Sequence, residues 1–233
     1  PHEPVPESPG IFSKDYTGIP EIVDWNGDGR LDVLMGGYVT GRVFYFENTG
    51  NAGDGPPTLT SRGPLLSDGE ILDVIWQASP TVADIDGDGL LELVTGSMYV
   101  SPSGGEAAPK DRPGLFMFRN VGTRTEPVLR QVPFPLEGPW VETFLLNPRF
   151  ADWNGDGLLD LVVGAGVQVS VYLNIGTPTE PRFSRQEPLR VPWVARMVHP
   201  DWMGDFDADG QLDLPPAHGG STVTPVYYTP LKL

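Results

Sequence analysis

Residues 152–160 read DWNGDGLLD, and variants of this nine-residue stretch occur at three other places in the chain. The other copies are DWNGDGRLD at 24–32, DIDGDGLLE at 84–92 and DFDADGQLD at 205–213. In chain order we number the four stretches loops 1 to 4; their first residues are 60, 68 and 53 positions apart. A unit that returns at such intervals indicates a repeat architecture, in which each copy builds one supersecondary unit.

The spacing of oxygen-bearing side chains in each loop is typical of a site for a hard cation. Asp or Asn stands at positions 1, 3 and 5, and position 9 is acidic in all four copies. These side chains can converge on one ion where glycine at position 6 bends the loop, and the carbonyl of position 7 adds a ligand. Calcium takes about six to eight oxygens, so we predict up to four Ca²⁺ sites. The expected ligands are Asp24, Asn26, Asp28, Arg30, Asp32, Asp84, Asp86, Asp88, Leu90, Glu92, Asp152, Asn154, Asp156, Leu158, Asp160, Asp205, Asp207, Asp209, Gln211 and Asp213.

Two other interpretations of the loops are less satisfactory. An EF-hand loop needs an acid at position 12, where this chain has Met35, Thr95, Val163 and Pro216. Ordinary Asp-Gly hairpin turns would account for one copy, but not for four copies with a matching ninth acid.

The repeat extends beyond the loop on both sides. Pro20, Pro80 and Pro148 each stand four residues before the first Asp of a loop. Strand-like residues follow each of loops 1 to 3, and a later strand ends in Asn-x-Gly at residues 48–50, 120–122 and 174–176. A fourth strand is expected around Leu129 and Phe183. Four short strands per repeat, without helical periodicity, predict an all-β fold, a β-propeller with four four-stranded blades; a β-sandwich is the alternative architecture.

Residues 150–164, FADWNGDGLLDLVVG, followed by NIGT at 174–177, resemble an FG-GAP/VCBS repeat. The resemblance covers nearly the whole chain and implies a propeller similar to integrin α-subunit heads and certain fungal lectins. It also implies calcium in the loop between the first two strands of each blade. Because this fold hosts adhesion proteins, lectins and a few polysaccharide lyases, the resemblance implies little about function.

The whole chain, residues 1–233, is expected to form a single propeller domain. Residues 7–13 resemble the fourth-strand segment 180–184, whereas the fourth repeat stops after a third strand near residues 226–228. Pairing of the N- and C-terminal strands would therefore complete a blade and remove exposed sheet edges. A fragment of a longer propeller, or two chains forming a larger ring, is the alternative.

The charge of the chain is concentrated in the loops. The formal net charge is −16, and the four loops hold 14 of the 31 acidic residues, which leaves 17 acids against 15 bases elsewhere. Nucleic acid and anionic membranes are therefore poor partners. The chain has no cysteine and no apolar run long enough to insert in a membrane. Because such loops suit the high calcium found outside the cell, we expect a secreted, periplasmic or cell-surface protein whose signal peptide has been removed.

The sequence favours binding over catalysis. The three histidines, His2, His199 and His218, stand in Pro-rich or turn segments and form no catalytic motif. We expect a non-catalytic module for adhesion or assembly that recognises a glycan or an extracellular protein, with a polysaccharide lyase as the alternative. The candidate contact residues are Trp76, Trp140 and Trp193, which stand eight, twelve and twelve residues before the next acidic loop. We expect them in the loops opposite the calcium face, although they could instead be core. The insertion at residues 101–113 is a possible rim.

Overall fold

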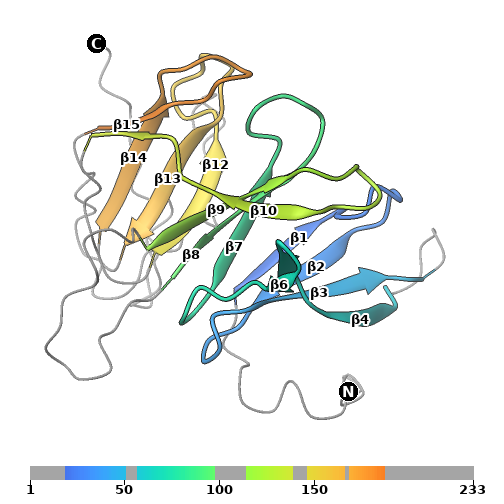
Figure 1. Ribbon diagram of the computed structural model, residues 1–233. Coiled ribbons are helices and arrows are strands. Elements are labelled where there is room, and N and C mark those ends of the chain that lie inside the picture. The colour runs from blue at the N-terminus through green and yellow to red at the C-terminus, as the bar shows by residue number, and fades with distance from the viewer. Residues whose placement is uncertain (1–18, 51–56, 98–113, 139–145, 166–167, 187–233) are drawn as a thin grey trace, which may run out of the picture.

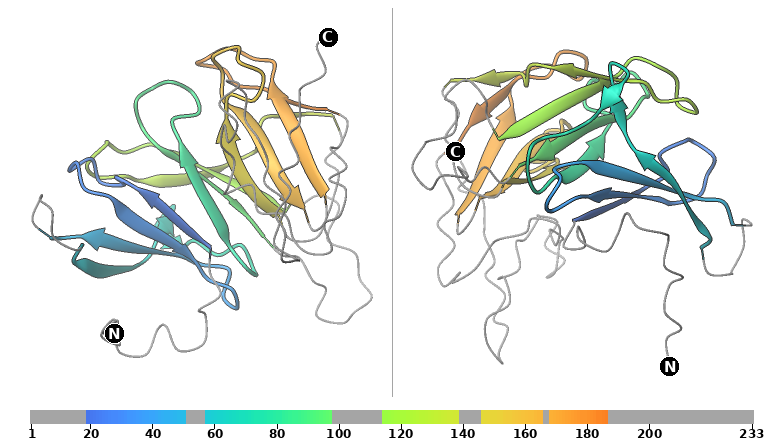
Figure 2. Two further views of the ribbon diagram at one scale, coloured as in Figure 1. Left: turned by 180° about the vertical axis from the view of Figure 1, so that it is seen from behind. Right: turned by 60° about the horizontal axis from the view of Figure 1, so that its bottom comes forward.

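A computed structural model of the chain describes residues 19–50, 57–97, 114–138, 146–165 and 168–186. These residues form three β-sheets and no helix, so the all-β expectation is confirmed for this part of the chain. The three sheets stand side by side and are twisted (Figures 1 and 2). No sheet closes on itself within the described ranges.

Each sheet contains four consecutive antiparallel strands in chain order. The first sheet consists of β1 (Pro20–Val23), β2 (Asp32–Gly36), β3 (Val43–Asn48) and β4 (Leu59–Pro64). The second contains β7 (Ser79–Ala83), β8 (Glu92–Gly96), β9 (Leu115–Asn120) and β10 (Leu129–Val132). The third contains β12 (Leu146–Ala151), β13 (Asp160–Ala165), β14 (Gln168–Asn174) and β15 (Phe183–Arg185). These are the strands that the sequence predicts for repeats 1 to 3.

The linkers between repeats add strands that the sequence analysis missed. After β4, the chain forms β5 (Leu66–Ser67), which pairs in parallel with β10, and β6 (Glu70–Ile71), which pairs with β5. After β10, β11 (Leu136–Glu137) pairs in parallel with β15. The chain that leaves one sheet therefore borders the outer edge of the next sheet before it enters that sheet's innermost strand.

The innermost strands explain the repeated proline. Pro20, Pro80 and Pro148 lie in β1, β7 and β12, the first strand of each sheet, and each faces a residue of the second strand. A first strand is an edge strand, so the missing N–H of proline interrupts no ladder on its open side. The edges meet at the middle of the molecule, where β7 contacts both β1 and β12.

The hydrophobic core consists of two layers, one on each side of the second sheet. Alternate residues of β8 and β9 point to opposite faces, as in any strand. Leu93 and Phe118 pack against the first sheet, while Val94 and Met117 pack against the third. A middle sheet that is buried on both faces accounts for the unbroken burial of β8.

Glycine at the end of the second strand in the first two sheets allows neighbouring sheets to approach closely. A Cβ atom built on Gly36 would lie 1.9 Å from the carbonyl oxygen of Ala78, and one on Gly96 would lie 1.7 Å from that of Leu146. Both carbonyl groups belong to the backbone at the next sheet's innermost strand. A side chain at either glycine would therefore push two sheets apart.

The fourth repeat lies outside the described residues, as do both terminal segments. Closure by pairing of the terminal strands and the extent of the domain over residues 1–233 therefore remain predictions. Among the described residues, no helix is long and apolar enough to cross a membrane.

We expect Gly96→Ala to lower the free energy of unfolding by about 3 kcal/mol or more, because its Cβ has no space beside the Leu146 carbonyl. The control is Gly69→Ala, where φ is +83° but no atom lies within 4 Å of the new Cβ. Backbone strain alone limits that loss to about 1–2 kcal/mol. Urea denaturation measures the free energy of unfolding of both variants. Equal losses of stability would contradict the argument that the sheets approach too closely for a side chain at Gly96.

Candidate metal centre

Three of the four predicted loops lie within the described residues, and each joins the first two strands of a sheet. Loop 1 joins β1 to β2, loop 2 joins β7 to β8, and loop 3 joins β12 to β13. Loop 4, with Asp205, Asp207, Asp209, Gln211 and Asp213, lies outside the described residues. The described loops occupy equivalent positions in their sheets, as the repeat predicts.

The backbone of loop 3 wraps around its first carboxylate. Asp152 accepts hydrogen bonds from the backbone N–H groups of Asp156 (3.0 Å) and Gly157 (2.9 Å). Asp156 in turn accepts one from the N–H of Leu158 (2.8 Å). Gly157 has φ of +87°, so the expected turn at position 6 is confirmed. All three contacts recur in loop 1. In loop 2, the aspartate at position 1 accepts the N–H of position 6, and the aspartate at position 5 accepts the N–H of position 7.

The ninth residue of each of the three described loops is a buried acid that fastens the loop to the third strand of its sheet. Asp32 is fully buried; its Oδ1 accepts the backbone N–H of Asn48 (2.7 Å), and its Oδ2 accepts the N–H of Trp25 and the hydroxyl of Tyr45. Asp160 makes the same two backbone contacts, with Asn174 (2.7 Å) and the second residue of loop 3 (2.9 Å). The loop pattern predicts a metal ligand at this position and gives no sign of the anchoring role.

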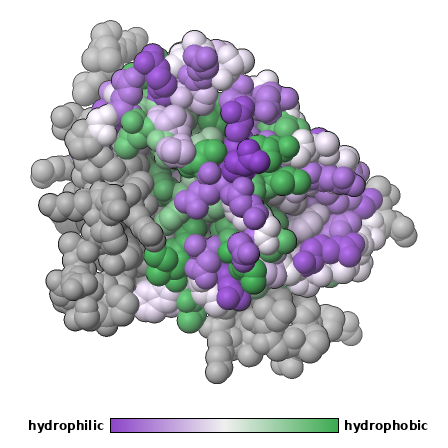
Figure 3. Space-filling model, viewed as in Figure 1, coloured by the Kyte–Doolittle hydropathy of each residue, from purple (hydrophilic) through white to green (hydrophobic). Residues whose placement is uncertain are grey.

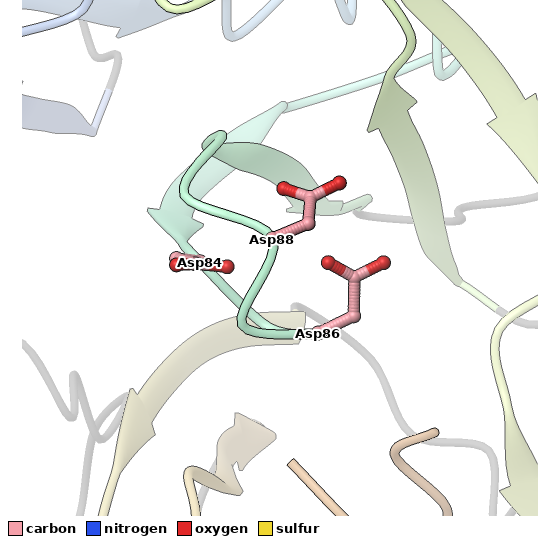
Figure 4. A group of neighbouring side chains, drawn as sticks. All are labelled: Asp84, Asp86 and Asp88. Atoms are coloured by element: carbon pink, nitrogen blue, oxygen red, sulfur yellow. The ribbon is translucent and has the colours of Figure 1, made fainter. Parts of the chain in front are cut away.

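Loop 2 brings three carboxylates together. Asp84, Asp86 and Asp88 each offer an oxygen, and these oxygens lie within 4.8 Å of one another. Figure 4 shows the three side chains on the single turn between β7 and β8. Arg119 on β9 pairs with Asp86 and lies 3.8 Å from Asp88. In loops 1 and 3 the third position is asparagine, which accepts from the N–H of position 5 and donates to its carboxylate.

Two oxygens of loop 2 are buried without a hydrogen-bond partner. They are Oδ1 of Asp84 and Oδ1 of Asp86. Burial raises the pKa of Glu92 to about 7; the backbone N–H groups of Ile85 and Asn120 oppose this rise, and the charges of Asp86 and Asp88 add to it. Buried oxygens with free lone pairs are the donors that a hard divalent cation needs, and a cation would favour the charged carboxylate. The residues of loop 2 therefore fit a bound metal ion.

The Asn-x-Gly motif closes the turn between the third and fourth strands. In the third sheet, Oδ1 of the buried Asn174 accepts the backbone N–H groups of Gly176 (3.0 Å) and Arg182 (3.1 Å). Asn48 and Asn120 bind their own turns in the same way. Because the N–H of Asn174 also binds Asp160, one residue connects the metal loop to this turn.

The opposite end of the first two sheets carries a strained turn at residues 72–78, in which Asp73 and Ile75 are exposed and Leu72, Val74, Gln77 and Ala78 are buried. The N–H of Trp76 donates to the carbonyl of Val74 (3.0 Å), and Ile75 between them has φ of +80° although its side chain is β-branched. Asp73 accepts the N–H of Ile75 (2.8 Å), and the hydroxyl of Ser97 donates to carbonyls of the turn. Such a conformation costs about 1–3 kcal/mol and persists only where its surroundings hold it.

Apolar side chains are exposed around this turn. Ile75 is 52% exposed, and Tyr38 and Val39 of the β2–β3 hairpin are 36% and 48% exposed. Backbone hydrogen bonds join the hairpin to the turn through Gly37, Tyr38 and Gly41. Trp76 is half-buried here. The other two candidate contact residues, Trp140 and Trp193, and the insertion at 101–113 lie outside the described residues, as do the three histidines.

An open groove lies between the outer strand β4 and the second sheet. Its volume is about 390 Å³, and Trp25, Tyr45, Arg62 and Leu129 are among its lining residues. Burial and the nearby Asp32 both raise the pKa of Tyr45, which keeps its hydroxyl protonated. A tyrosine that acts as a base needs the opposite shift of its pKa.

Figure 3 shows green hydrophobic patches alternating with purple hydrophilic ones on the side of the molecule seen in Figure 1.

The strands and loops define a class of protein, an all-β repeat protein in which each sheet carries one acidic loop between its first two strands. The chain belongs to the family of FG-GAP-like repeat proteins, whose model matches residues 24–95 and 152–214. The two matched segments begin at the first residues of loops 1 and 3 and together include all four loops. The sequence-based resemblance to this family is therefore confirmed.

The chain is also similar to integrin alpha-IIb of Homo sapiens. The two sequences are 29% identical over 167 residues, which cover 65% of this chain and 15% of the integrin subunit. The match thus spans a small part of that relative.

We expect Asn174→Ala to lower the free energy of unfolding by about 2 kcal/mol, because two backbone N–H groups lose their buried acceptor. Thr179→Ala, in the exposed part of the same turn, is the control and should change stability by less than about 0.5 kcal/mol. Urea denaturation in fixed calcium measures both. Equal stability of the two variants would contradict the role given to the asparagine.

Proposed function

We propose that the chain is a calcium-binding β-propeller module that acts outside the cell and binds a protein or glycan partner without chemistry. The observation that carries the proposal is the loop that recurs in three sheets, with the N–H of position 6 bound to the first carboxylate and a buried acid at position 9. In loop 2 the unpartnered oxygens add direct support for a cation. The expected ligands of all four loops remain those that the sequence analysis names.

Calcium fits these loops better than other common ions. The donors are carboxylate, amide and carbonyl oxygens, whereas zinc favours nitrogen and sulfur ligands. Magnesium demands a compact octahedron and usually retains several waters, so it suits less well a loop that offers protein oxygens at positions 1, 3, 5, 7 and 9. Loops of this type, when they bind calcium with Kd of about 10⁻⁴–10⁻³ M, are loaded only in extracellular calcium. This range supports a secreted, periplasmic or cell-surface location.

The partner surface that we propose is the end of the propeller opposite the metal loops. The Ile75 turn and the β2–β3 hairpin present exposed apolar side chains on a backbone that hydrogen bonds hold in one conformation. A rigid apolar surface loses little entropy on binding. Similarity to an integrin subunit supports a role in adhesion. Trp76, Trp140 and Trp193 remain candidate contacts with a glycan or protein.

The alternative, a polysaccharide lyase on the same scaffold, receives less support. Among the described residues, the groove beside β4 brings aromatic and basic side chains together, as such chemistry would require. Its tyrosine is hydrogen-bonded to Asp32 and has a raised pKa. Turnover of a polysaccharide by the pure protein, abolished by Tyr45→Phe or Arg62→Ala, would overturn the non-catalytic proposal.

Removal of calcium should lower the melting temperature. With calcium at ten times Kd, each occupied site stabilises the fold by about 1.4 kcal/mol, so three sites contribute about 4 kcal/mol. For a chain of this size, that loss corresponds to about 8–16 °C in Tm. Calorimetry with excess chelator, and after calcium is restored, measures the change. An unchanged Tm in protein confirmed to be metal-free would sink the calcium proposal.

A single carboxylate in loop 2 should control part of this binding. We expect Asp88→Asn to weaken calcium binding at loop 2 by about tenfold or more, because it removes a charged ligand. Asp68→Asn removes one exposed charge outside the loops and should leave every calcium affinity within about twofold. Isothermal titration of both variants makes the comparison, and equal effects would show that only net charge matters.

The partner surface can be tested with a panel of extracellular-matrix proteins and a glycan array in calcium buffer. We expect Ile75→Asp to weaken the best panel interaction by at least about tenfold without lowering calcium-dependent stability. Val121→Asp, an exposed site in the β9–β10 turn at the metal-loop end, should leave binding unchanged. Binding that depends on Val121 and not on Ile75 would place the partner at the wrong end for this proposal.

A further inference from the structure

Loops 1 and 3 differ in a single residue. Position 7 is Arg30 in loop 1 and Leu158 in loop 3, and the other eight residues are identical. The two loops are therefore a natural pair for judging what the arginine does.

Arg30 folds back over its own loop. Its Nε donates to the carbonyl oxygen of Asn48 (2.6 Å), and its Nη2 pairs with the Asp28 carboxylate. The two side chains are only 28% and 23% exposed, so the ion pair is partly shielded from water. A guanidinium charge therefore lies directly on the fifth-position carboxylate of loop 1.

A second guanidinium reaches loop 1 from the neighbouring sheet. Arg124, in the β9–β10 turn, donates to the carbonyls of Asp24 (2.5 Å) and Trp25 (3.0 Å), and its Nη2 lies 3.4 Å from the Asp24 carboxylate. Its Cγ would lie 2.9 Å from a Cβ on Gly27, so the side chain packs tightly against the loop. In the third sheet the equivalent residue is Pro178, which lies against Gly87 of loop 2 and carries no charge.

The two arginines leave loop 1 much less negative than its counterparts. They pair with two of its three acids, and the third is the buried anchor Asp32. Loop 2 has four acids and one paired arginine, Arg119. For loop 3, none of the described arginines forms an ion pair with Asp152 or Asp156. Counting only the arginines of the described residues, loop 1 has one net negative charge and loops 2 and 3 have three each.

We propose that Arg30 and Arg124 are resident cations of loop 1, so that this loop keeps its fold without calcium and binds calcium more weakly than loop 3. The inference rests on the proposed calcium function. A guanidinium a few ångströms from a divalent ion in a wet site opposes binding by about tenfold per charge. Loops 2 and 3 then carry most of the calcium dependence of the described part of the fold.

The test is a reciprocal exchange at position 7 in the full chain. Arg30→Leu gives loop 1 the sequence of loop 3, and Leu158→Arg gives loop 3 the sequence of loop 1. The amide resonances of Gly29 and Gly157, which each donate to the first Asp of their loop, report the calcium Kd of each loop by NMR titration. Arg42→Leu, at the opposite end of the first sheet, is the matched control for loss of one positive charge.

In the unmodified chain, the calcium Kd at loop 1 should exceed that at loop 3 by about tenfold or more. Arg30→Leu should lower the loop 1 Kd by about tenfold, and Leu158→Arg should raise the loop 3 Kd by about the same factor; Arg42→Leu should change neither. Equal Kd values at the two loops, or no response to both exchanges, would overturn this inference while calcium binding stands. Absence of a calcium shift at both glycines would overturn the proposed function, and the inference with it.

A second readout does not depend on affinity. Chelated Arg30→Leu protein should melt at a lower temperature than the chelated unmodified chain, because Asp28 loses its resident cation. Saturating calcium should remove most of that difference. If Arg30→Leu lowers Tm equally with and without calcium, the arginine is only a packing residue and the inference fails. Leu158→Arg, at a partly exposed position in loop 3, keeps the comparison possible if Arg30→Leu does not fold without calcium.

Discussion

The rest of each sheet depends on one buried carboxylate, the ninth residue of the acidic loop. In the first sheet, Asp32 starts the second strand, accepts the N–H of the loop's second residue and accepts the N–H of Asn48 at the end of the third strand. A buried acid is tolerable only when donors surround it, and these donors are backbone groups at fixed places. The loop, two strands and the following turn are therefore arranged around a single side chain.

Contacts between sheets add a second constraint, which concerns space. The core lies between the sheets, and of the three described sheets only the second contributes to both hydrophobic layers, with Leu93 facing the first sheet and Val94 facing the third. At the ends of β2 and β8 that lie away from the acidic loops, neighbouring sheets come so close that a residue with a Cβ atom would not fit. Gly36 and Gly96 occupy these places beside the backbone of the next sheet. Arg124 joins two sheets at the loop end by binding carbonyls of loop 1. Neighbouring sheets thus contact each other through side chains along most of their length, and through the backbone at the end opposite the acidic loops.

The sequence predicts the local elements well, because they repeat and have a clear period. The positions of the strands in the first three repeats and the turn at Gly157 could both be inferred from it. The partners of Arg124 could not, because they stand about 100 residues away and the repeat gives no sign of them. The parallel strands β5 and β11 were also missed, since two residues carry no detectable period. The strained turn at Ile75 has no sequence signal, because glycine is the residue usually expected at such a φ value.

The short strands β5 and β11 have a consequence for where this chain can be divided. Each follows the last strand of one repeat in sequence, yet it borders the sheet of the next. A break placed between sequence repeats, just before β7 or β12, would separate a sheet from its own outer border and expose the edge of β10 or β15. The unit that folds is therefore offset from the unit that repeats. A shortened chain that keeps the second sheet intact has to begin upstream of Leu66, inside what looks like the end of the preceding repeat.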